Sequence, residues 1–221
     1  APLCAARDTI PITAPAARRA MPDQLCVAVA GARSYTYAEA TASQELPHWI
    51  AAHVHAFSVL GGASRLIVPD NLRAGVTRAH RYEPEINPTY AEMAAHYSAG
   101  VIPARPRKPR DKAKAEQGVL LAERWVLAAL RHRTFFSIAE ANEAIRERLA
   151  WLNARPFRKL PGSRTSLFAE LDRPALRPLP AQPYEYAVWK TATVNIDYHV
   201  EVDRHWYSVP YQLVGEGCDI R

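Results

Sequence analysis

Apolar residues recur along the first hundred positions with two alternating periods, the short period of strands and the longer period of helices. Apolar runs or alternation predict strands, and positions spaced by three and four predict helices. The predicted strands cover 9–13, 24–30, 34–40, 65–69 and 101–104, with a hairpin loop at 31–33. The predicted helices cover 43–60, which Gly61 ends, and a segment that Asn87 and Pro88 open. This alternation of strands and helices is typical of an α/β fold.

The second half of the chain changes character twice. Prolines and cations fill 103–114, and a long helix is then predicted to about 131. Ser137 and Glu140 form a capping-box sequence that opens a helix ending before Pro156. Residues 154–187, rich in proline and arginine, predict a linker with a short helix at 166–171. Strands at 193–202 and 206–214 then predict the start of a small β-barrel.

Composition excludes two protein classes. Of the 221 residues, 48% are hydrophobic, which excludes a mainly disordered chain, and no apolar run is long enough for a membrane helix. The net charge is +6 and 23 of the 28 Lys and Arg residues are arginine, which favours a nucleic-acid partner, although GC-rich codon usage also explains an arginine excess. Three scattered cysteines and no signal peptide favour a reducing, cytoplasmic location.

Two carboxylates are candidates for chemistry. Asp70 follows an apolar strand, where α/β proteins place ligand-binding groups, although a turn or helix-cap role is the common alternative. Glu116 lies one to two turns into the predicted long helix and shares a face with Lys112, although an ordinary solvated helix surface is the more common explanation for a single Glu.

A basic segment precedes Glu116. Six cations lie within ten residues, a density suited to a phosphate backbone, although a solvated loop or a proline-rich ligand is the alternative. They are Arg105, Arg107, Lys108, Arg110, Lys112 and Lys114. The nearby histidines at 48, 53 and 55 have poor metal-ligand spacing and are interpreted as surface or packing residues. The sequence contains no Walker loop, GxGxxG or GxSxG motif.

Six long stretches of the chain form an ordered set of motifs. They are YTYAEAT (35–41), VPDNLRAGV (68–76), INPTYAEMAAHY (86–97), PARPRKPRDKAKAE (103–116), LNARPFRKLPGSRTSLFAELDRPALRPLP (152–180) and VNIDYHVEVDRHWYSVPYQLVG (194–215). These stretches resemble the IstA-type transposases of bacterial insertion sequences, which are related to retroviral integrase and phage Mu transposase. The resemblance implies a ribonuclease-H-like integrase core, a mixed sheet with flanking helices, over 1–135. A helical extension and linker over 136–187 and the start of a small, incomplete β-barrel over 188–221 would follow.

The resemblance also implies an activity, cleavage of DNA and transfer of its 3′ ends during transposition. An Asp-Asp-Glu triad would hold two Mg²⁺ or Mn²⁺ ions, with Asp70 as the second Asp and Glu116 as the Glu. The six cations would contact the DNA backbone. The implied partners are element-end and target DNA, sister subunits of a homo-multimer and an AAA+ helper ATPase, with no membrane. The implied location is the bacterial cytoplasm, in association with the nucleoid.

The first Asp of the family pattern is missing from this sequence. Residues 9–12 match the strand that follows it, which puts its expected position at Cys4. The nearest carboxylate, Asp8, lies four residues later, on the same face of a regular strand but about 13 Å away. Two hypotheses follow: a metal-dependent transposase, or a catalytically inactive remnant, truncated at both ends, that only binds DNA or sister subunits. A proline-rich interaction module is a third, weaker interpretation, since it leaves the ordered α/β pattern unexplained.

Overall fold

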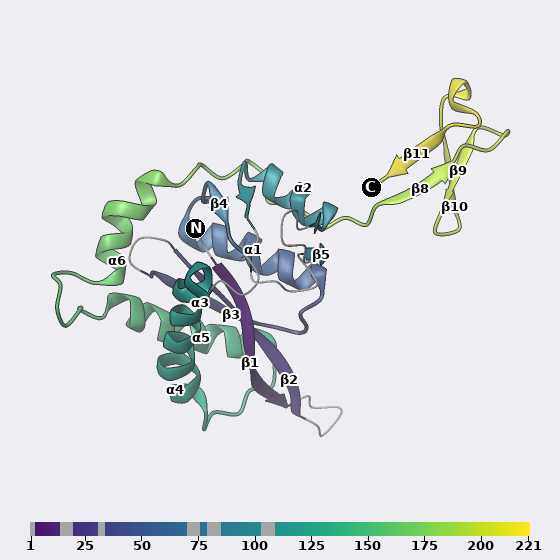
Figure 1. The fold of residues 1–221 in the computed structure, drawn as a ribbon. Helices are drawn as coiled ribbons and strands as arrows, with labels where there is room; N and C mark the ends of the chain where they lie inside the picture. The colour runs from purple at the N-terminus through teal and green to yellow at the C-terminus, as the bar shows by residue number, and fades with distance from the viewer. Residues whose placement is uncertain (1–2, 14–19, 31–33, 70–75, 79–84, 103–108) are drawn as a thin grey trace. The chain divides into compact units, whose positions relative to one another are not determined.

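The computed structural model describes residues 3–13, 20–30, 34–69, 76–78, 85–102 and 109–221 (Figure 1). Within these ranges, residues 3–13, 20–23, 76–78, 85 and 109–115 are described by their backbone alone. The chain divides into two compact units, Ala1–Tyr184 (unit 1) and Glu185–Arg221 (unit 2). Unit 1 mixes helices and strands, and unit 2 is built from short strands.

An antiparallel three-stranded sheet forms the centre of unit 1. Its strands are β1 (Leu3–Thr13), β2 (Ala20–Val29) and β3 (Thr36–Thr41), in that order across the sheet. The predicted strands at 24–30 and 34–40 are confirmed, and β2 and β3 pair antiparallel, while the loop predicted at 31–33 lies outside the described residues. The strand predicted at 9–13 is the second half of the longer β1.

Alternation along β2 divides the core into two layers. Leu25, Val27 and Val29 pack with the helices of the second half of unit 1, and Cys26 packs with the helices of the first half. Figure 1 shows these two groups of helices on opposite sides of the sheet. The first group is α3 (Pro109–Ala122), α4 (Ala128–Leu130) and α5 (Ile138–Ala154), and the second is α1 (Leu46–Leu60) and α2 (Pro88–His96).

The helix boundaries follow their capping residues. Gly61, at φ 70°, ends α1 in the left-handed conformation that glycine adopts without strain. The Asn87 side chain accepts a hydrogen bond from Thr89 N at 3.0 Å and opens α2. Ser137 Oγ accepts one from Glu140 N at 3.1 Å and opens α5. These three predicted boundaries are confirmed to within a few residues.

One predicted helix has an irregular turn. The segment predicted from 110 to 131 is helical from Pro109 to Leu130, but residues Glu123–Leu127 form a π-helical turn, η1, between α3 and α4. Hydrophobic periodicity does not distinguish such a turn from α-helix. π-Turns within α-helices are frequent at functional sites.

The edge of β3 is closed by two asparagines of α5. Asn153 accepts from Thr36 N at 3.1 Å and donates to Thr36 O at 2.8 Å. Asn142 makes the same pair of bonds to Ala40, at 2.7 and 3.0 Å. The side-chain amides therefore take the hydrogen-bonding places that a fourth strand would occupy at these two positions.

The remaining elements of unit 1 are short. They are β4 (Leu66–Ile67) parallel to β7 (Gly100–Val101), β5 (Val76–Arg78) antiparallel to β6 (Glu85–Ile86), α6 (Arg164–Leu167), the π-turn η2 (Phe168–Asp172) and the 3₁₀ turn η3 (Arg173–Ala175). Part of the predicted linker is fixed to the unit. Arg177 and Ala63 exchange two backbone hydrogen bonds, and Tyr184 Oη donates to Glu92 Oε2 at 3.1 Å.

Unit 2 contains two antiparallel strand pairs and a 3₁₀ turn. β9 (His199–Val202) pairs with β10 (His205–Ser208), and β8 (Lys190–Thr193) pairs with β11 (Gly217–Ile220), with η4 at Tyr211–Leu213. Asp203 and Arg204 both have positive φ, as a two-residue type I′ hairpin requires. The predicted strand lengths are wrong, because Tyr198 at φ 64° divides the segment 193–202 and β10 ends at Ser208, two residues before Pro210. The expected barrel stays a prediction.

Candidate functional site

The α3 helix presents Glu116 to solvent. Val119, Ala122 and Val126 are buried in the core cluster that includes β2 and β3. Glu116 lies three residues before Val119 and is exposed. The helix is therefore anchored by its apolar face, and its single described carboxylate before the π-turn is accessible to a ligand.

Gly118 lets α3 approach the sheet closely. A Cβ atom built at Gly118 would lie 2.1 Å from Cγ2 of Val29, far inside the contact distance of two carbon atoms. Val29 is itself 1% exposed and belongs to the same core cluster. The absence of a side chain two residues after Glu116 therefore sets the distance between the helix that carries this carboxylate and the central strand.

The predicted site residues are described to different extents. Glu116 has a described side chain, and Arg110, Lys112 and Lys114 lie in the described backbone of α3. Asp70, Arg105, Arg107 and Lys108 lie outside the described residues. The described chain before Asp70 comprises β4, which ends at Ile67, and the buried Pro69. Asp70 and Glu116 thus stay a predicted pair.

The expected position of the first carboxylate lies within the sheet. Cys4 is in β1, opposite Ala28 of β2. The strand register shifts between Ala6 and Thr9, an interval that contains Asp8. The expectation that Cys4 and Asp8 share a face assumes a regular strand, and this register shift interrupts the alternation of faces between them. Among the residues whose side chains are described, no group of three or more His, Cys, Asp or Glu residues could hold a metal ion.

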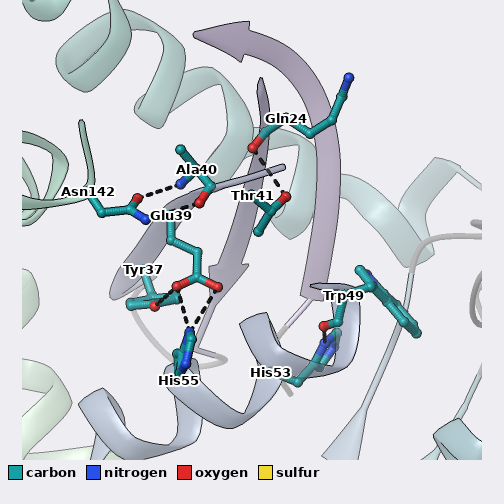
Figure 2. A network of polar contacts seen from close by, with 9 residues as sticks. All are labelled: Gln24, Tyr37, Glu39, Ala40, Thr41, Trp49, His53, His55 and Asn142. Atoms are coloured by element: carbon teal, nitrogen blue, oxygen red, sulfur yellow. Dashed lines mark hydrogen bonds and ion pairs between the residues drawn. The ribbon is translucent and has the colours of Figure 1, made fainter. Parts of the chain in front are cut away.

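A buried carboxylate that the sequence analysis missed lies on β3. Glu39 is 9% exposed and accepts a hydrogen bond from Tyr37 Oη at 2.7 Å (Figure 2). Its Oε2 also lies 3.0 Å from Nδ1 of His55 on α1. Burial, followed by the charge of Glu39, raises the pKa of Tyr37, while the hydrogen bond to Glu39 raises the pKa of His55. Strand alternation places Tyr37 and Glu39 on one face, but only the fold brings His55 to them.

The interpretation of the histidines as surface or packing residues agrees with the structure at 53. Nδ1 of His53 lies 2.8 Å from Trp49 O, and Nε2 lies 3.3 Å from Tyr90 Oη (Figure 2 shows the first contact). Burial lowers the pKa of His53 to about 4. A neutral, buried imidazole between aromatic rings has a packing role, and His55 contributes an ion-pair partner at the surface of α1.

Comparison with known proteins covers almost the whole chain. This chain is 51% identical over 213 residues to the putative transposase y4bL/y4kJ/y4tB of Sinorhizobium fredii. It is 48% identical over 205 residues to the putative transposase for insertion sequence IS408 of Burkholderia multivorans, and 47% identical over 213 residues to that for IS1162 of Pseudomonas fluorescens. The matches cover 96%, 93% and 96% of this chain. This chain is a homologue of insertion-sequence transposases.

The match covers less than half of each of these relatives. The chain spans 41%, 40% and 38% of the length of the three relatives. The Mu transposase C-terminal domain family matches residues 179–221. The resemblance stated from the sequence motifs is confirmed at the level of insertion-sequence transposases.

Solved structures give the fold of the core. The HTLV-2 integrase catalytic core domain in complex with magnesium is 14% identical, with a TM-score of 0.55, and the match covers 76% of this chain and 94% of that one. The catalytic core domain of BIV integrase matches with a TM-score of 0.53 at 12% identity, over 78% of this chain and 95% of that one. A simian T-cell lymphotropic virus intasome chain matches with a TM-score of 0.58 at 15% identity, over 94% of this chain and 66% of that one. The fold is therefore that of an integrase catalytic core, as expected for transposases of this kind.

Two further findings bear on the expectations from composition. Among the described cysteine side chains, that of Cys218 is a free thiol. No helix in the described part of the chain is both long and apolar enough to cross a membrane.

Proposed function

We propose that this chain is the catalytic-core part of an insertion-sequence transposase, which cleaves DNA and transfers its 3′ ends in a divalent-metal-dependent reaction. The observation that carries the proposal is the 51% identity to a putative transposase, found on a chain with an integrase-core fold. In this proposal Asp70 and Glu116 bind metal. The six cations at 105, 107, 108, 110, 112 and 114 bind the phosphates beside them.

The residues of this chain fit the metal only in part. Glu116 offers the hard, solvent-accessible oxygen that Mg²⁺ and Mn²⁺ prefer. The position expected for the first carboxylate is Cys4, and a thiol is a soft ligand that these ions disfavour. Bound divalent ions would supply charge stabilisation for phosphoryl transfer, but two carboxylates of three hold them poorly.

The second candidate function follows from Cys4. A chain with this substitution would keep the fold and bind DNA or sister subunits without cutting, as an inactive remnant. Both candidates have the same proposed partners, which are element-end and target DNA, sister subunits of a homo-multimer and an AAA+ helper ATPase. Their proposed location is the nucleoid region of a bacterial cytoplasm. In both, unit 2 is proposed to be the start of a small β-barrel.

A cleavage assay tests the two candidates. The purified chain is incubated with duplex DNA carrying the ends of its own insertion sequence, with Mg²⁺ or Mn²⁺, and nicked and strand-transfer products are measured. Cleavage that is lost in Asp70→Asn and Glu116→Gln, and retained in the exposed control Glu147→Gln, supports the enzyme. Cleavage unchanged by the first two substitutions refutes the site.

The Cys4→Asp variant separates the remnant from a wrong assignment. If the parent chain binds DNA but cuts none, and Cys4→Asp introduces metal-dependent cutting, the missing carboxylate is the cause of inactivity. If neither chain cuts, the proposed metal site is wrong for this chain even though the fold is right.

A further inference from the structure

The connection between α5 and α6, predicted as part of a linker, is a loop of defined shape. Phe157 N donates to Gly162 O at 3.0 Å, and Pro156 forms a β-bridge with Ser163. Gly162 has φ 84°, and Ser163 and Ser166 cap each other at the start of α6. Figure 1 shows this loop at the edge of unit 1, on the left of the view. We call residues 155–164 the basic loop.

The basic loop carries four cations, of which two stack on aromatic rings and two are exposed. The Arg155 guanidinium lies against two neighbouring indoles, 4.3 Å from the ring centre of Trp125 and 5.5 Å from that of Trp151. The Arg164 guanidinium lies 5.2 Å from the ring centre of Phe157. Arg158 and Lys159 are exposed near the end of the loop. Stacking fixes the plane of a guanidinium and leaves its N–H edge available, so Arg155 is oriented before any ligand arrives.

These positive charges have no acidic partner in the described part of the chain. None of the four takes part in an ion pair there. Nε of Arg164 is buried without a hydrogen-bond partner among the described residues. Burial, followed by the charge of Arg155, lowers the pKa of Arg164. Like charges are thus held close together at a place where an anion would stabilise them.

We propose that the basic loop is a second DNA-binding surface that contacts the phosphate backbone through Arg155, Arg158 and Lys159. This inference rests on the proposed function. Trp125, which holds Arg155, lies nine residues after Glu116 on one continuous helix, about 13 Å along its axis. The two positions are about half a turn apart around the helix axis, so a duplex contacts both only if it follows the surface of unit 1 around the helix. Duplex DNA carries one negative charge per roughly 1.7 Å of its axis, which supplies closely spaced phosphates to the loop along such a path.

Salt-dependent binding tests the inference with a matched control. Fluorescence anisotropy measures the affinity of the 221-residue chain for a labelled 30-base-pair duplex across a series of salt concentrations. The double variant Arg158→Ala/Lys159→Ala is compared with Arg148→Ala/Arg173→Ala, which removes two exposed cations elsewhere in unit 1. Two lost phosphate contacts reduce the slope of log K against log salt by about 1.8, which at 0.1 M salt is a loss of about 60-fold relative to binding at 1 M salt. The control retains the slope of the parent chain.

Three outcomes overturn the inference. The loop variant could retain the slope of the parent, lose no more than the control, or lose binding to poly-L-glutamate while binding DNA normally, which would indicate an acidic protein partner. Thermal unfolding of both variants shows that the fold is intact, and Arg158→Glu/Lys159→Glu must weaken DNA binding further. The loop substitutions are also made in the Glu116→Gln chain. If they lower DNA affinity there as well, while cleavage is absent, the loop binds DNA whether or not the proposed catalytic function is correct.

Discussion

Replacement of Gly118 by alanine is expected to destabilise the protein, although helix propensity alone predicts the opposite. Alanine is favoured over glycine within a helix by about 0.8–1.0 kcal/mol. The new methyl group, however, would lie 2.1 Å from Cγ2 and 3.4 Å from Cβ of Val29. The sign of the change therefore reports whether the contact with Val29 outweighs the helix propensity of alanine.

The magnitude follows from the two opposing effects. Carbon atoms in contact lie about 3.5–4.0 Å apart, so the overlap with Val29 Cγ2 is about 1.5 Å. Val29 is 1% exposed and has no room to turn away. Overpacking costs about 1–3 kcal/mol, and an overlap of about 1.5 Å belongs to the upper part of that range, about 2–3 kcal/mol. Subtracting the helix-propensity gain of about 1 kcal/mol leaves an expected net loss of about 1–2 kcal/mol in the free energy of unfolding. Relief by helix displacement would move Glu116, two residues away, and reduce the cleavage proposed above.

Urea unfolding followed by circular dichroism measures this change. The matched control is Gly217→Ala, where an added Cβ meets nothing within 4 Å, and which should change stability by less than about 0.5 kcal/mol. The double variant Gly118→Ala/Val29→Ala should recover part of the loss, with a coupling energy of about 1–3 kcal/mol. A Gly118→Ala protein as stable as the parent chain, or more stable, would refute the packing of α3 on Val29.

Other predictions concern the β3 edge and the histidines. Asn153→Ala leaves the buried N–H and C=O of Thr36 unpaired and should cost about 2–3 kcal/mol in urea unfolding, while the more exposed Asn142→Ala costs less; equal losses would contradict the role of burial. Burial lowers the pKa of His53 to about 4, so the contribution of neutral His53 to the free energy of unfolding is complete above about pH 6.5. About 3 kcal/mol of this contribution is lost as the pH falls towards 4, and a His53→Gln chain with the same pH dependence would disprove this. His55 has a raised pKa, so its stabilisation is present below about pH 6.5 and is lost as the pH rises through that pKa; Glu39→Gln should remove this dependence, measured in the same titration.

Local signals in the sequence predicted the parts of the fold that depend on local chemistry. Asn87 and Ser137 cap helices because their side chains reach backbone N–H groups two or three residues ahead. A continuous apolar run identified β2 and alternation identified β3. In unit 2 the period-two pattern continues through Tyr198, whose left-handed conformation ends one strand segment before β9 begins. The π-turn in the long helix leaves no mark in hydrophobic spacing.

The sequence predicted less of the candidate site than of the fold, because the residues that contact one another there are distant in the chain. Glu116 was predicted from a motif, the structure describes it as an exposed residue of α3, and its role stays a prediction. Glu39 was passed over because a carboxylate in an alternating strand resembles an outward-facing residue, and only packing against α1 shows it to be buried. The basic loop was predicted to be part of a linker, because its sequence does not show that Arg155 stacks on Trp125, 30 positions away in the chain.

The two asparagines that close β3 also limit how the chain can change in length. They lie 11 residues apart on α5, close to three helical turns, and engage backbone groups four residues apart on the strand. One inserted or deleted residue between them would rotate one amide by about 100° away from the strand. We expect the length of α5 between Asn142 and Asn153 to be invariant among working relatives of this chain, a constraint on insertions and deletions that no single substitution would reveal.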